Sequence, residues 1–349
     1  MAKRGGTGEF NEHMVRLKDI AARGGVSVMT VSKALRGASD IAPGTKARIR
    51  LLADQLGYVP DSMAQGLRSR TTKLFGLILP TVANPIFART VSAIEERAHE
   101  LGYDLILAHN LNLSEREEVC IRRLLSRRVD GIFIFPVYRL SPVAGIYEEL
   151  ARRGTPVVIM GHRAPFCANF HNVETDDLRG SGLVTRHLLE LGHRSIAFLC
   201  GPGSAPWAME RLEGYRRALR EAAIVTEDRL LFHAGNTIEE GEKAALQILH
   251  EAPTITAVQS SSDMAAIGAA NVFMNQGLRI PNDLSVAGFG NILTSEHFRV
   301  PLTTVRQPKL RLGAAAMEMM VKLLRGENPQ PRRLPAEIIV RASTGPPKS

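Results

Sequence analysis

The sequence predicts a small all-helical module followed by a larger α/β region of two doubly wound parallel-sheet subdomains. Between residues 17 and 57, apolar residues recur at helical spacing between glycine and proline breaks. From residue 74 onward, short apolar runs alternate with amphipathic helical stretches. Of a net charge of +9 over 349 residues, residues 1–73 carry +7 (13 Lys and Arg against six Asp and Glu). This concentration of positive charge suits a polyanionic partner for the helical module.

Two short helices joined by a tight turn are predicted over residues 17–35. The Gly24-Gly25 pair ends the first helix, because glycine readily adopts the left-handed conformation of a helix stop. Ser27 is placed to cap the second helix by accepting a hydrogen bond from a backbone N–H near Thr30. The second helix then runs to about Arg36.

The two faces of this second helix differ in character. Its predicted core face consists of Val31, Ala34 and Leu35. The opposite face consists of Val28, Met29, Ser32 and Lys33. The side chains of that second face are too apolar and too short for an ordinary solvated surface. They suit a helix that lies in the major groove of DNA. The alternative is a small helical cap on an enzyme.

A third helix is predicted over residues 43–56, with Pro43 at its first position and a stop at Gly57. We expect these three helices to form a compact helical domain over residues 15–60. Residues 1–14 are polar and rich in glycine, so we expect a disordered tail without the apolar core of a signal peptide.

Residues 61–73 are expected to form a short helix and a linker. The short helix spans residues 62–68, where Met63, Ala64 and Leu67 are apolar and Gly66 weakens the helix. Such a segment can fold on contact with a polyanion, with Leu67 as an apolar wedge. A plain flexible linker is the alternative.

Residues 74–349 are expected to form the α/β domain. Its predicted strands are 74–79, 104–108, 131–135, 157–160, 195–199, 229–232, 257–260, 285–289 and 338–340. Its predicted helices include 87–101, 114–127, 179–191, 211–222, 239–250, 263–276 and 309–325. A seam at residues 175–177 and a return at residues 303–308 divide the domain into an N-subdomain (about 74–175 plus 307–330) and a C-subdomain (about 176–304 plus 335–345).

The motifs of common enzyme classes are missing from the sequence. No Gly-x-Gly-x-x-Gly follows the first strand, and there is no phosphate-binding Walker loop, Gly-x-Ser-x-Gly elbow or His-Glu-x-x-His. Three scattered cysteines lack metal-site spacing and suit a reducing compartment. We therefore expect no catalytic residues, no cofactor and no metal. No apolar run is long enough to span a membrane, so we expect a cytoplasmic protein without a membrane partner.

Polar and aromatic residues follow successive predicted strands, where open α/β sheets bind ligands. They are Asn84 with Ile86 and Phe87, His162 with Arg163, Trp207 with Arg211, Asn236, Ser262 with Asp263, and Gly290 with Asn291. Together they predict a small-molecule cleft. Trp207 can stack on a ring, and Arg211, placed at the start of a helix, can clamp a hydroxyl-rich or anionic ligand. Alternatively, Arg211 is an ordinary surface arginine and Asp263 a carboxylate stabilised by the helix dipole.

Several motifs resemble those of the lactose/purine repressor (LacI-type) family of bacterial transcription regulators. The specific ones are Lys18-Asp-Ile-Ala, Gly25-Val-Ser-x-x-Thr-Val-Ser-Lys33, Leu56-Gly-Tyr-x-Pro60 and Ala64-x-x-Leu67. Supporting ones are Arg128-Val-Asp-Gly131, Leu191-Gly-His-Arg-x-Ile196, Arg211-x-x-Gly214-Tyr, Ser262-Asp-Met-Ala-Ala-Ile-Gly268 and Leu302-Thr-Thr-Val-Arg-Gln-Pro308. The resemblance covers residues 16–345. It implies a helix-turn-helix, a hinge helix and a periplasmic-binding-protein-like effector domain of two subdomains.

The resemblance also implies functional residues. The DNA-binding positions are Lys18, Ser27, Val28, Met29, Thr30, Ser32, Lys33, Met63, Ala64 and Leu67. The effector-binding positions are Ile86, Phe87, His162, Trp207, Arg211, Asn236, Asp263, Gly290 and Gln307. The implied partners are double-stranded operator DNA, a small-molecule effector and a second copy of the chain, as a homodimer or a larger assembly.

Three positions depart from the family pattern. Gly290 replaces a usual aspartate, Asn236 replaces a frequent aromatic residue, and Asp61 replaces an asparagine before the hinge helix. The first two imply a non-standard ligand or a loss of small-molecule control. We interpret the chain as a repressor that binds a pseudo-palindromic operator under the control of a sugar-like effector. The alternative is a solute-binding protein of a sugar transporter, which the helical module disfavours.

Overall fold

The computed structural model describes residues 15–59 and 71–348. The chain forms two compact units, Met1–Arg70 and Thr71–Ser349. The expectations for the tail at residues 1–14 and for Met63, Ala64 and Leu67 lie outside the described residues. Each unit is described by itself.

The first unit contains three helices, α1 (Leu17–Gly24), α2 (Val28–Leu35) and α3 (Pro43–Gln55). Gly25 ends α1 in the left-handed conformation, with φ of 62°. The predicted cap of α2 is confirmed, since Ser27 Oγ accepts a hydrogen bond of 3.1 Å from the backbone N–H of Thr30. The core of the unit consists of Ile20, Ala21, Val31, Ala34, Ile49 and Ala53, all buried.

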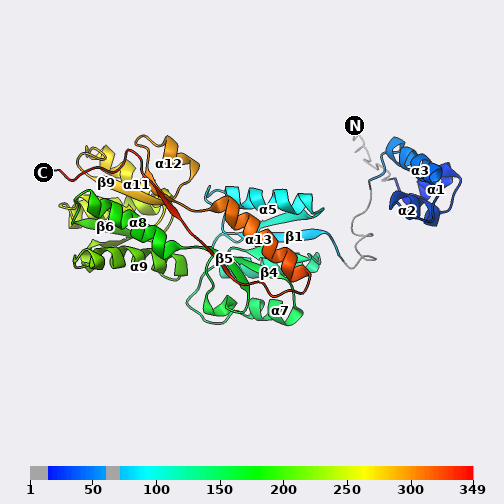
Figure 1. Ribbon diagram of the computed structural model, residues 1–349, viewed down its shortest axis with the longest axis horizontal. Helices are drawn as coiled ribbons and strands as arrows, with labels where there is room; N and C mark the ends of the chain where they lie inside the picture. The colour runs from blue at the N-terminus through cyan, green and yellow to red at the C-terminus, as the bar shows by residue number, and fades with distance from the viewer. Residues whose placement is uncertain (1–14, 60–70, 349) are drawn as a thin grey trace, which may run out of the picture. The chain divides into compact units, whose positions relative to one another are not determined.

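The second unit is built on two six-stranded sheets (Figure 1). The strands of the first sheet are, in spatial order, β11 (Arg332–Leu334), β5 (His171–Thr175), β4 (Val157–Met160), β3 (Gly131–Ile134), β1 (Leu74–Leu79) and β2 (Asp104–His109). Those of the second are β12 (Glu337–Ile339), β10 (Thr303–Arg306), β9 (Ser285–Gly290), β8 (Ala257–Ser260), β6 (Ile196–Cys200) and β7 (Leu231–His233). All strand pairs are parallel except β10 with β12.

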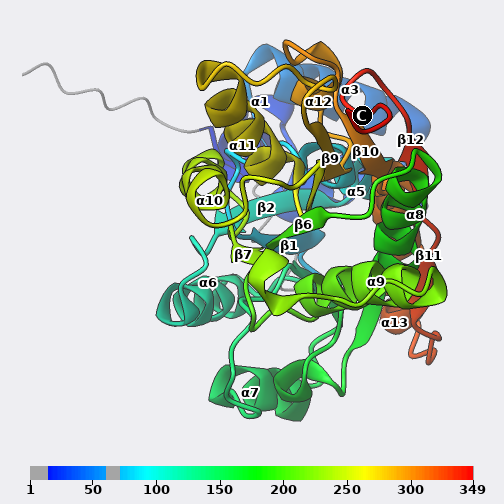
Figure 2. The same cartoon turned by 90° about the vertical axis from the view of Figure 1, so that its left-hand side faces the viewer.

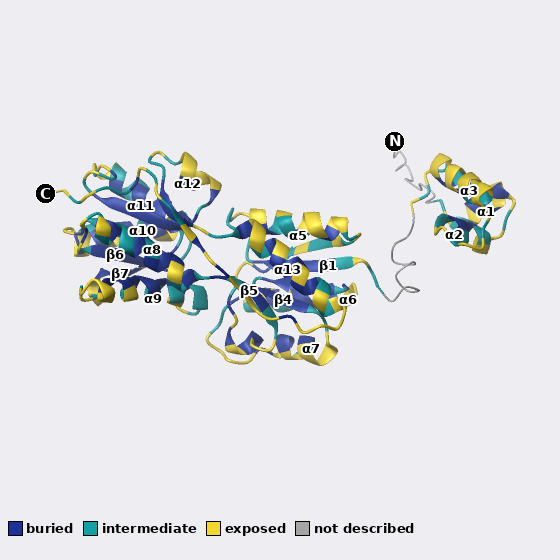
Figure 3. Cartoon of the chain, viewed as in Figure 1, coloured by how far each residue is buried: buried dark blue, intermediate teal, exposed yellow. Residues whose placement is uncertain are grey.

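Helices cover both faces of each sheet. On the first sheet, α5 (Ala88–Glu100) and α13 (Lys309–Leu324) pack on one face, and α6 (Ser114–Ser126) and α7 (Gly145–Arg153) on the other. On the second, α10 (Ile238–Glu251) and α11 (Asp263–Asn275) oppose α8 (Asp177–Glu190) and α9 (Pro206–Glu221), as Figure 2 shows. A short helix, α12 (Leu293–His297), follows β9. The inner strands form a buried layer, whereas the edge strands β2, β11 and β12 are partly exposed, and the outer helix faces are exposed (Figure 3).

The chain passes between the two sheets three times: between β5 and α8, between β10 and α13, and between β11 and β12. These passages make the two sheets the centres of two subdomains, called here the N-subdomain (first sheet) and the C-subdomain (second sheet). The predicted fold class, a helical module before two doubly wound parallel sheets, is confirmed.

Several element predictions were wrong in detail. The sequence did not predict three strands and one helix: β5, β10, β11 and α7. The three strands are rich in polar residues or lie at a sheet edge. The predicted strand 229–232 starts too early, since Asp228–Leu230 forms a 3₁₀ turn before β7. The predicted helix 211–222 starts too late: α9 begins at Pro206, where proline suits a first helical position.

Candidate functional site

A cavity of about 460 Å³ lies between the two subdomains, at the carboxyl ends of their strands. Residues that follow β1, β3, β4 and β5 line one side, and residues that follow β6, β7, β8 and β10 line the other. In open α/β sheets, ligands bind outside the carboxyl ends of the strands, so the topology of the two sheets explains the position of the cavity. Its volume falls in the range of small-molecule sites.

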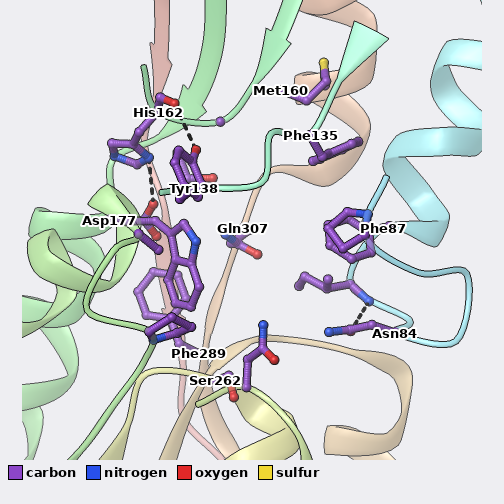
Figure 4. Close-up of a pocket in the computed structure, with 18 of the residues that line it drawn as sticks. Asn84, Phe87, Phe135, Tyr138, Met160, His162, Asp177, Ser262, Phe289 and Gln307 are labelled. Carbon is purple, nitrogen blue, oxygen red and sulfur yellow. Dashed lines mark hydrogen bonds and ion pairs between the residues drawn. The ribbon is translucent and has the colours of Figure 1, made fainter. Parts of the chain in front are cut away.

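Aromatic side chains form two walls of the cavity. In the N-subdomain, Phe87 meets Phe135 edge to face, with ring centroids 4.9 Å apart. In the C-subdomain, Trp207 and Phe289 line the opposite side. Figure 4 shows Phe87 and Phe289 on separate sides, with the amide of Gln307 between them. A planar or ring-shaped ligand fits between such walls.

Arg211 is buried beside the C-subdomain wall, and not at the surface. Its guanidinium lies 3.7 Å from the ring centroid of Phe289 and 4.5 Å from that of Trp207. The prediction that it stands at a helix start was wrong, because α9 begins five residues earlier. Burial lowers the pKa of Arg211, although the Asp177 carboxylate opposes the shift.

Asp177 holds the Arg211 side chain in place. Arg211 Nε donates to Asp177 Oδ1 at 2.8 Å, Nη2 lies 2.6 Å from the same oxygen, and Nη1 donates to the backbone carbonyl of Ser261 at 2.6 Å. The geometry depends on the close packing of α8 on α9. A Cβ atom at Gly214 would lie 2.2 Å from the carbonyl oxygen of Leu178, so only glycine allows this approach.

His162 connects the two subdomains at the side of the cavity. Its Nε2 atom lies 3.1 Å from Glu210 Oε2, and its Nδ1 atom lies 3.6 Å from Asp177 Oδ2. Burial alone lowers the pKa of His162, but Glu210 and Asp177 outweigh it and raise the pKa above its ordinary value. The hydroxyl of Tyr138 donates to the His162 carbonyl at 2.9 Å (Figure 4).

Glu210 is the centre of the same ionic network. Burial opposes its ionisation, yet hydrogen bonds from His162 and Arg333 lower its pKa to about 2. Arg333 also binds Glu174 at 3.1 Å and Asp176 at 3.0 Å, both next to the β5–α8 passage. The network therefore lies across the connection between the subdomains.

Asp263 acts as an anchor within the C-subdomain. It accepts hydrogen bonds from the backbone N–H of Ile292 at 3.0 Å, from Ser295 Oγ at 2.6 Å and from Thr304 Oγ1 at 2.5 Å. Burial raises its pKa, which these bonds oppose. The chain itself therefore supplies hydrogen-bond donors to both carboxylate oxygens, two to Oδ2 and one to Oδ1.

Gly290 is the one predicted effector position that does not line the cavity. Its φ is +140°, and a Cβ atom there would lie 3.0 Å from Ile86 Cδ1. The ammonium group of Lys309, a residue that sequence reasoning missed, donates to the carbonyls of Gly290 and Asn291. Burial lowers the pKa of Lys309 to about 8, against the attraction of Asp263.

The other predicted effector positions all line the cavity: Ile86, Phe87, His162, Trp207, Arg211, Asn236, Asp263 and Gln307. Sequence reasoning missed Phe135, Tyr138, Met160 and Asp177, which also line it. Phe135 and Met160 lie at the ends of predicted strands, so the same strand-end signal applied to apolar residues would have found them.

The candidate DNA-binding surface is on α2. Val28 and Met29 are 46% and 57% exposed, although both are apolar. Lys18 and Ser27 are exposed, Thr30 and Ser32 are half-buried, and the half-buried Lys33 forms an ion pair of 2.5 Å with Asp40. This pair lowers the pKa of Asp40 through the hydrogen bond from Lys33. An exposed apolar pair beside basic groups is a surface suited to base edges and phosphates.

Across residues 15–59 and 71–348, no group of His, Cys, Asp and Glu side chains is arranged to hold a metal ion. Within the same ranges, no helix is both long and apolar enough to cross a membrane.

Comparison with known proteins links both regions to regulators. Residues 16–61 match the family model for bacterial regulatory proteins of the lacI family, and residues 185–344 match that for the periplasmic binding protein-like domain. The HTH-type transcriptional repressor PurR of Vibrio atlanticus is 31% identical over 334 residues, which cover 95% of this chain and 98% of PurR.

Two solved structures share the architecture. The Lac repressor dimer bound to operator and the anti-inducer ONPF matches with a TM-score of 0.84 at 27% identity, over 95% of this chain and 99% of that one. The transcriptional regulator CelR in complex with cellobiose matches with a TM-score of 0.72 at 29% identity, over 94% and 99%.

Proposed function

The chain belongs to the LacI family of bacterial transcriptional regulators, and we propose that it is a repressor that binds its operator as a dimer and responds to a ligand in the inter-subdomain cavity. The observation that carries the proposal is the cavity itself, which is lined by both subdomains and lies at their strand ends. A ligand that contacts both subdomains stabilises one of their relative arrangements, and this differential contact is what regulation requires.

We assign sequence reading to α2. Met29 and Val28 are placed to contact thymine methyl groups, and Lys33 to contact a guanine edge after it leaves Asp40. Lys18, Ser27, Thr30 and Ser32 lie around this surface and supply hydrogen bonds to phosphates or bases. Met63, Ala64 and Leu67, outside the described residues, are assigned to the minor groove from the sequence alone.

We assign ligand contact to the cavity-lining positions of both subdomains. Ile86, Phe87 and His162 contribute from the N-subdomain, and Trp207, Arg211, Asn236 and Asp263 contribute from the C-subdomain, with Gln307 on the passage between them. Gly290 shapes the site indirectly, because its missing side chain leaves room for Ile86. Two copies of the chain would read the two halves of a pseudo-palindrome in the cytoplasm.

The proposal is tested by selecting binding sites for the full-length chain from a random DNA pool. A repressor of this kind enriches one pseudo-palindromic sequence, and its affinity falls steeply as salt concentration rises. Sedimentation of the selected complex gives its stoichiometry, which should be two chains per site. The proposal would be contradicted if the selection enriched no sequence, or if the DNA affinity did not change with salt concentration.

A further inference from the structure

We propose that the second unit has a DNA-contact surface of its own, a basic edge of the N-subdomain that binds phosphates of the same duplex that α2 reads. The surface is the edge at which the strands of the first sheet begin. The inference rests on the proposed function only in taking DNA as the partner. It adds a contact that supplies affinity without sequence preference.

The topology of the first sheet gathers the ends of its helices at one edge. All of its strand pairs are parallel, so its strands begin at the same edge and the α-helices that lead into them end there. We call this the N-edge, and define it as the entry of the chain together with the last turn of each of these α-helices and the loop to the next strand. It comprises residues 71–73, 97–103, 123–130, 150–156 and 321–331.

The N-edge is strongly basic. It contains nine Lys and Arg against three Asp and Glu, which is a net charge of +6 with histidine neutral. Residues 74–349 as a whole carry only +2, so the rest of the second unit is slightly acidic. Charge of one sign that is concentrated on one edge gives a local potential that attracts a polyanion.

Most of these basic side chains have no acidic partner. Three of the nine, Lys73, Arg97 and Arg153, contact an aromatic ring or a carboxylate. The other six are exposed, and over residues 15–59 and 71–348 their side chains form no ion pair or hydrogen bond: Arg123, Arg127, Arg128, Arg152, Lys322 and Arg325. Such a group can bind a phosphate without breaking an internal ion pair.

The corresponding edge of the C-subdomain shows that helix ends alone do not explain this charge. The helix dipole favours basic residues at any helix C-terminus, and both subdomains have such ends. The C-edge is defined in the same way, with the segment that follows the antiparallel strand β12 added. It comprises residues 187–195, 218–230, 248–256, 272–284, 294–302 and 340–348, and contains seven basic and seven acidic residues.

The basic residues of the C-edge are also mostly paired. Five of the seven form ion pairs with carboxylates: Arg220, Arg229, Arg279, Arg341 and Lys348. A sixth, Arg194, donates to the carbonyls of Leu189 and His193. The two edges share one kind of topology, but only the N-edge presents an unpaired excess of positive charge.

The entry of the chain favours DNA over other polyanions. The chain enters the second unit at β1 (Figure 1), and only residues 60–70 separate the described part of the first unit from Thr71. This entry is fixed to the N-edge, because the N–H of Thr72 donates to Asp130 Oδ1 at 2.9 Å and its hydroxyl donates to the Arg128 carbonyl at 2.8 Å. DNA held by the first unit is therefore tethered to the N-edge at a high effective concentration.

Removal of charge from the N-edge tests the proposal. Arg123→Gln/Arg127→Gln/Arg128→Gln removes three exposed charges from the full-length chain, and its melting temperature checks that the fold is retained. Affinity for the selected operator duplex is measured by fluorescence anisotropy between about 50 and 200 mM salt. Each lost phosphate contact reduces the slope of log affinity against log salt concentration by about 0.9. We expect the slope to decrease by about 2 and the affinity at the lowest salt to fall about tenfold.

A matched variant controls for the overall field of the chain. Arg220→Gln/Arg229→Gln/Arg299→Gln removes the same charge from the C-edge, and we expect it to change the slope by less than about 0.5. The ratio of operator to random-sequence affinity should be unchanged in both variants, because phosphate contacts carry no sequence information. Equal slopes in the two variants, or no change in the N-edge variant, would overturn the inference.

Site-directed cross-linking locates the contact independently. The native cysteines Cys120, Cys167 and Cys200 are buried, so a cysteine added at the surface takes up a photoactivatable azide label selectively. Ser126→Cys places the label at the end of α6 in the N-edge, and Ala222→Cys places it at the end of α9 in the C-edge; both positions are exposed. We expect DNA cross-links from position 126 and not from position 222. Equal yields, or no cross-link from position 126, would contradict the inference.

The outcomes separate this inference from the proposed function. If the chain selects a pseudo-palindrome and the N-edge variant keeps the original salt dependence, the proposed function stands and the inference fails. If no sequence is selected but position 126 cross-links to duplex DNA, the inference stands and the proposed function fails. Binding to vesicles of anionic lipid that the N-edge variant abolishes, with unchanged DNA affinity, would assign the edge to a membrane surface and overturn the inference.

Discussion

Arg333 on β11 donates two hydrogen bonds to the Glu210 carboxylate on α9, at 2.6 and 2.9 Å, and this ion pair joins the N-subdomain to the C-subdomain. Each residue has a further partner on the opposite subdomain or on the passage between them: Glu210 lies 3.1 Å from His162, and Arg333 lies 3.0 Å from Asp176. The arrangement of the two subdomains is therefore held by side-chain charges as well as by the three chain passages.

Glu210→Gln should lower the free energy of unfolding by about 1 kcal/mol, because it weakens two partly exposed charge-assisted bonds to Arg333 and one to His162. Urea unfolding of the full-length chain measures the change. Glu213→Gln, whose surface ion pair with Arg220 lies on the same helix, is the control and should have a smaller effect. Equal losses in the two variants would show that the inter-subdomain pair adds nothing.

His162 should make stability depend on pH. Because its folded pKa is raised above 6.5, its contribution is fully present below pH 6.5 and is lost as pH rises through the folded pKa. His162→Gln should therefore lose less stability than the unmodified chain when pH is raised from about 6 to about 8. Chemical unfolding at both pH values measures the difference.

The pH control is His250→Gln, which removes an exposed histidine of α10. Burial lowers the pKa of His187 and His193, but both residues are present in every variant and cancel in the comparison. A pH dependence unchanged by His162→Gln would contradict the assignment.

Gly290→Ala should cost about 1–3 kcal/mol, because a φ of +140° is strained for any residue with a side chain. The contact with Ile86 Cδ1 adds less, since the end of that side chain can move. The double variant Ile86→Ala/Gly290→Ala should therefore not recover the stability. Gly145→Ala, where a Cβ would meet no atom within 4 Å, is the matched control. Full recovery in the double variant would assign the cost to steric overlap with Ile86.

Met29→Ala should weaken operator binding about tenfold, or about 1.4 kcal/mol, without lowering the melting temperature. Met29 is more than half exposed, so its removal leaves no cavity. Val31→Ala removes apolar volume from the buried face of α2, so it should lower the melting temperature. Fluorescence anisotropy with labelled DNA gives the affinity, and an unchanged value for Met29→Ala would remove it from the DNA contact.

Leu67→Ser should weaken binding to a palindrome with a flexible central step more than binding to non-specific DNA. The reason is that an apolar side chain is suited to wedge between base pairs, whereas a serine is not. Competition assays with the two DNA types measure the ratio. A uniform loss on both would assign Leu67 to general affinity and not to a wedge.

The sequence by itself determined the local features of this protein. The left-handed stop at Gly25, the Ser27 cap and the spacing of Val31 and Ala34 all depend on neighbours within four residues, so they were predictable. The strand–helix alternation likewise predicted two parallel sheets and placed Trp207 and His162 near their carboxyl ends.

Only the tertiary structure decided what those residues do to one another. Arg211 is neutralised by Asp177, 34 positions away, and Lys309 is held by the carbonyl of Gly290, from the opposite subdomain. Ile86 occupies the space that a side chain at Gly290 would need. Burial sets the strength of such pairings, and burial depends on how distant segments pack, which no local pattern records. The charge that the cavity presents to a ligand is for this reason a property of the fold and not of the residue list.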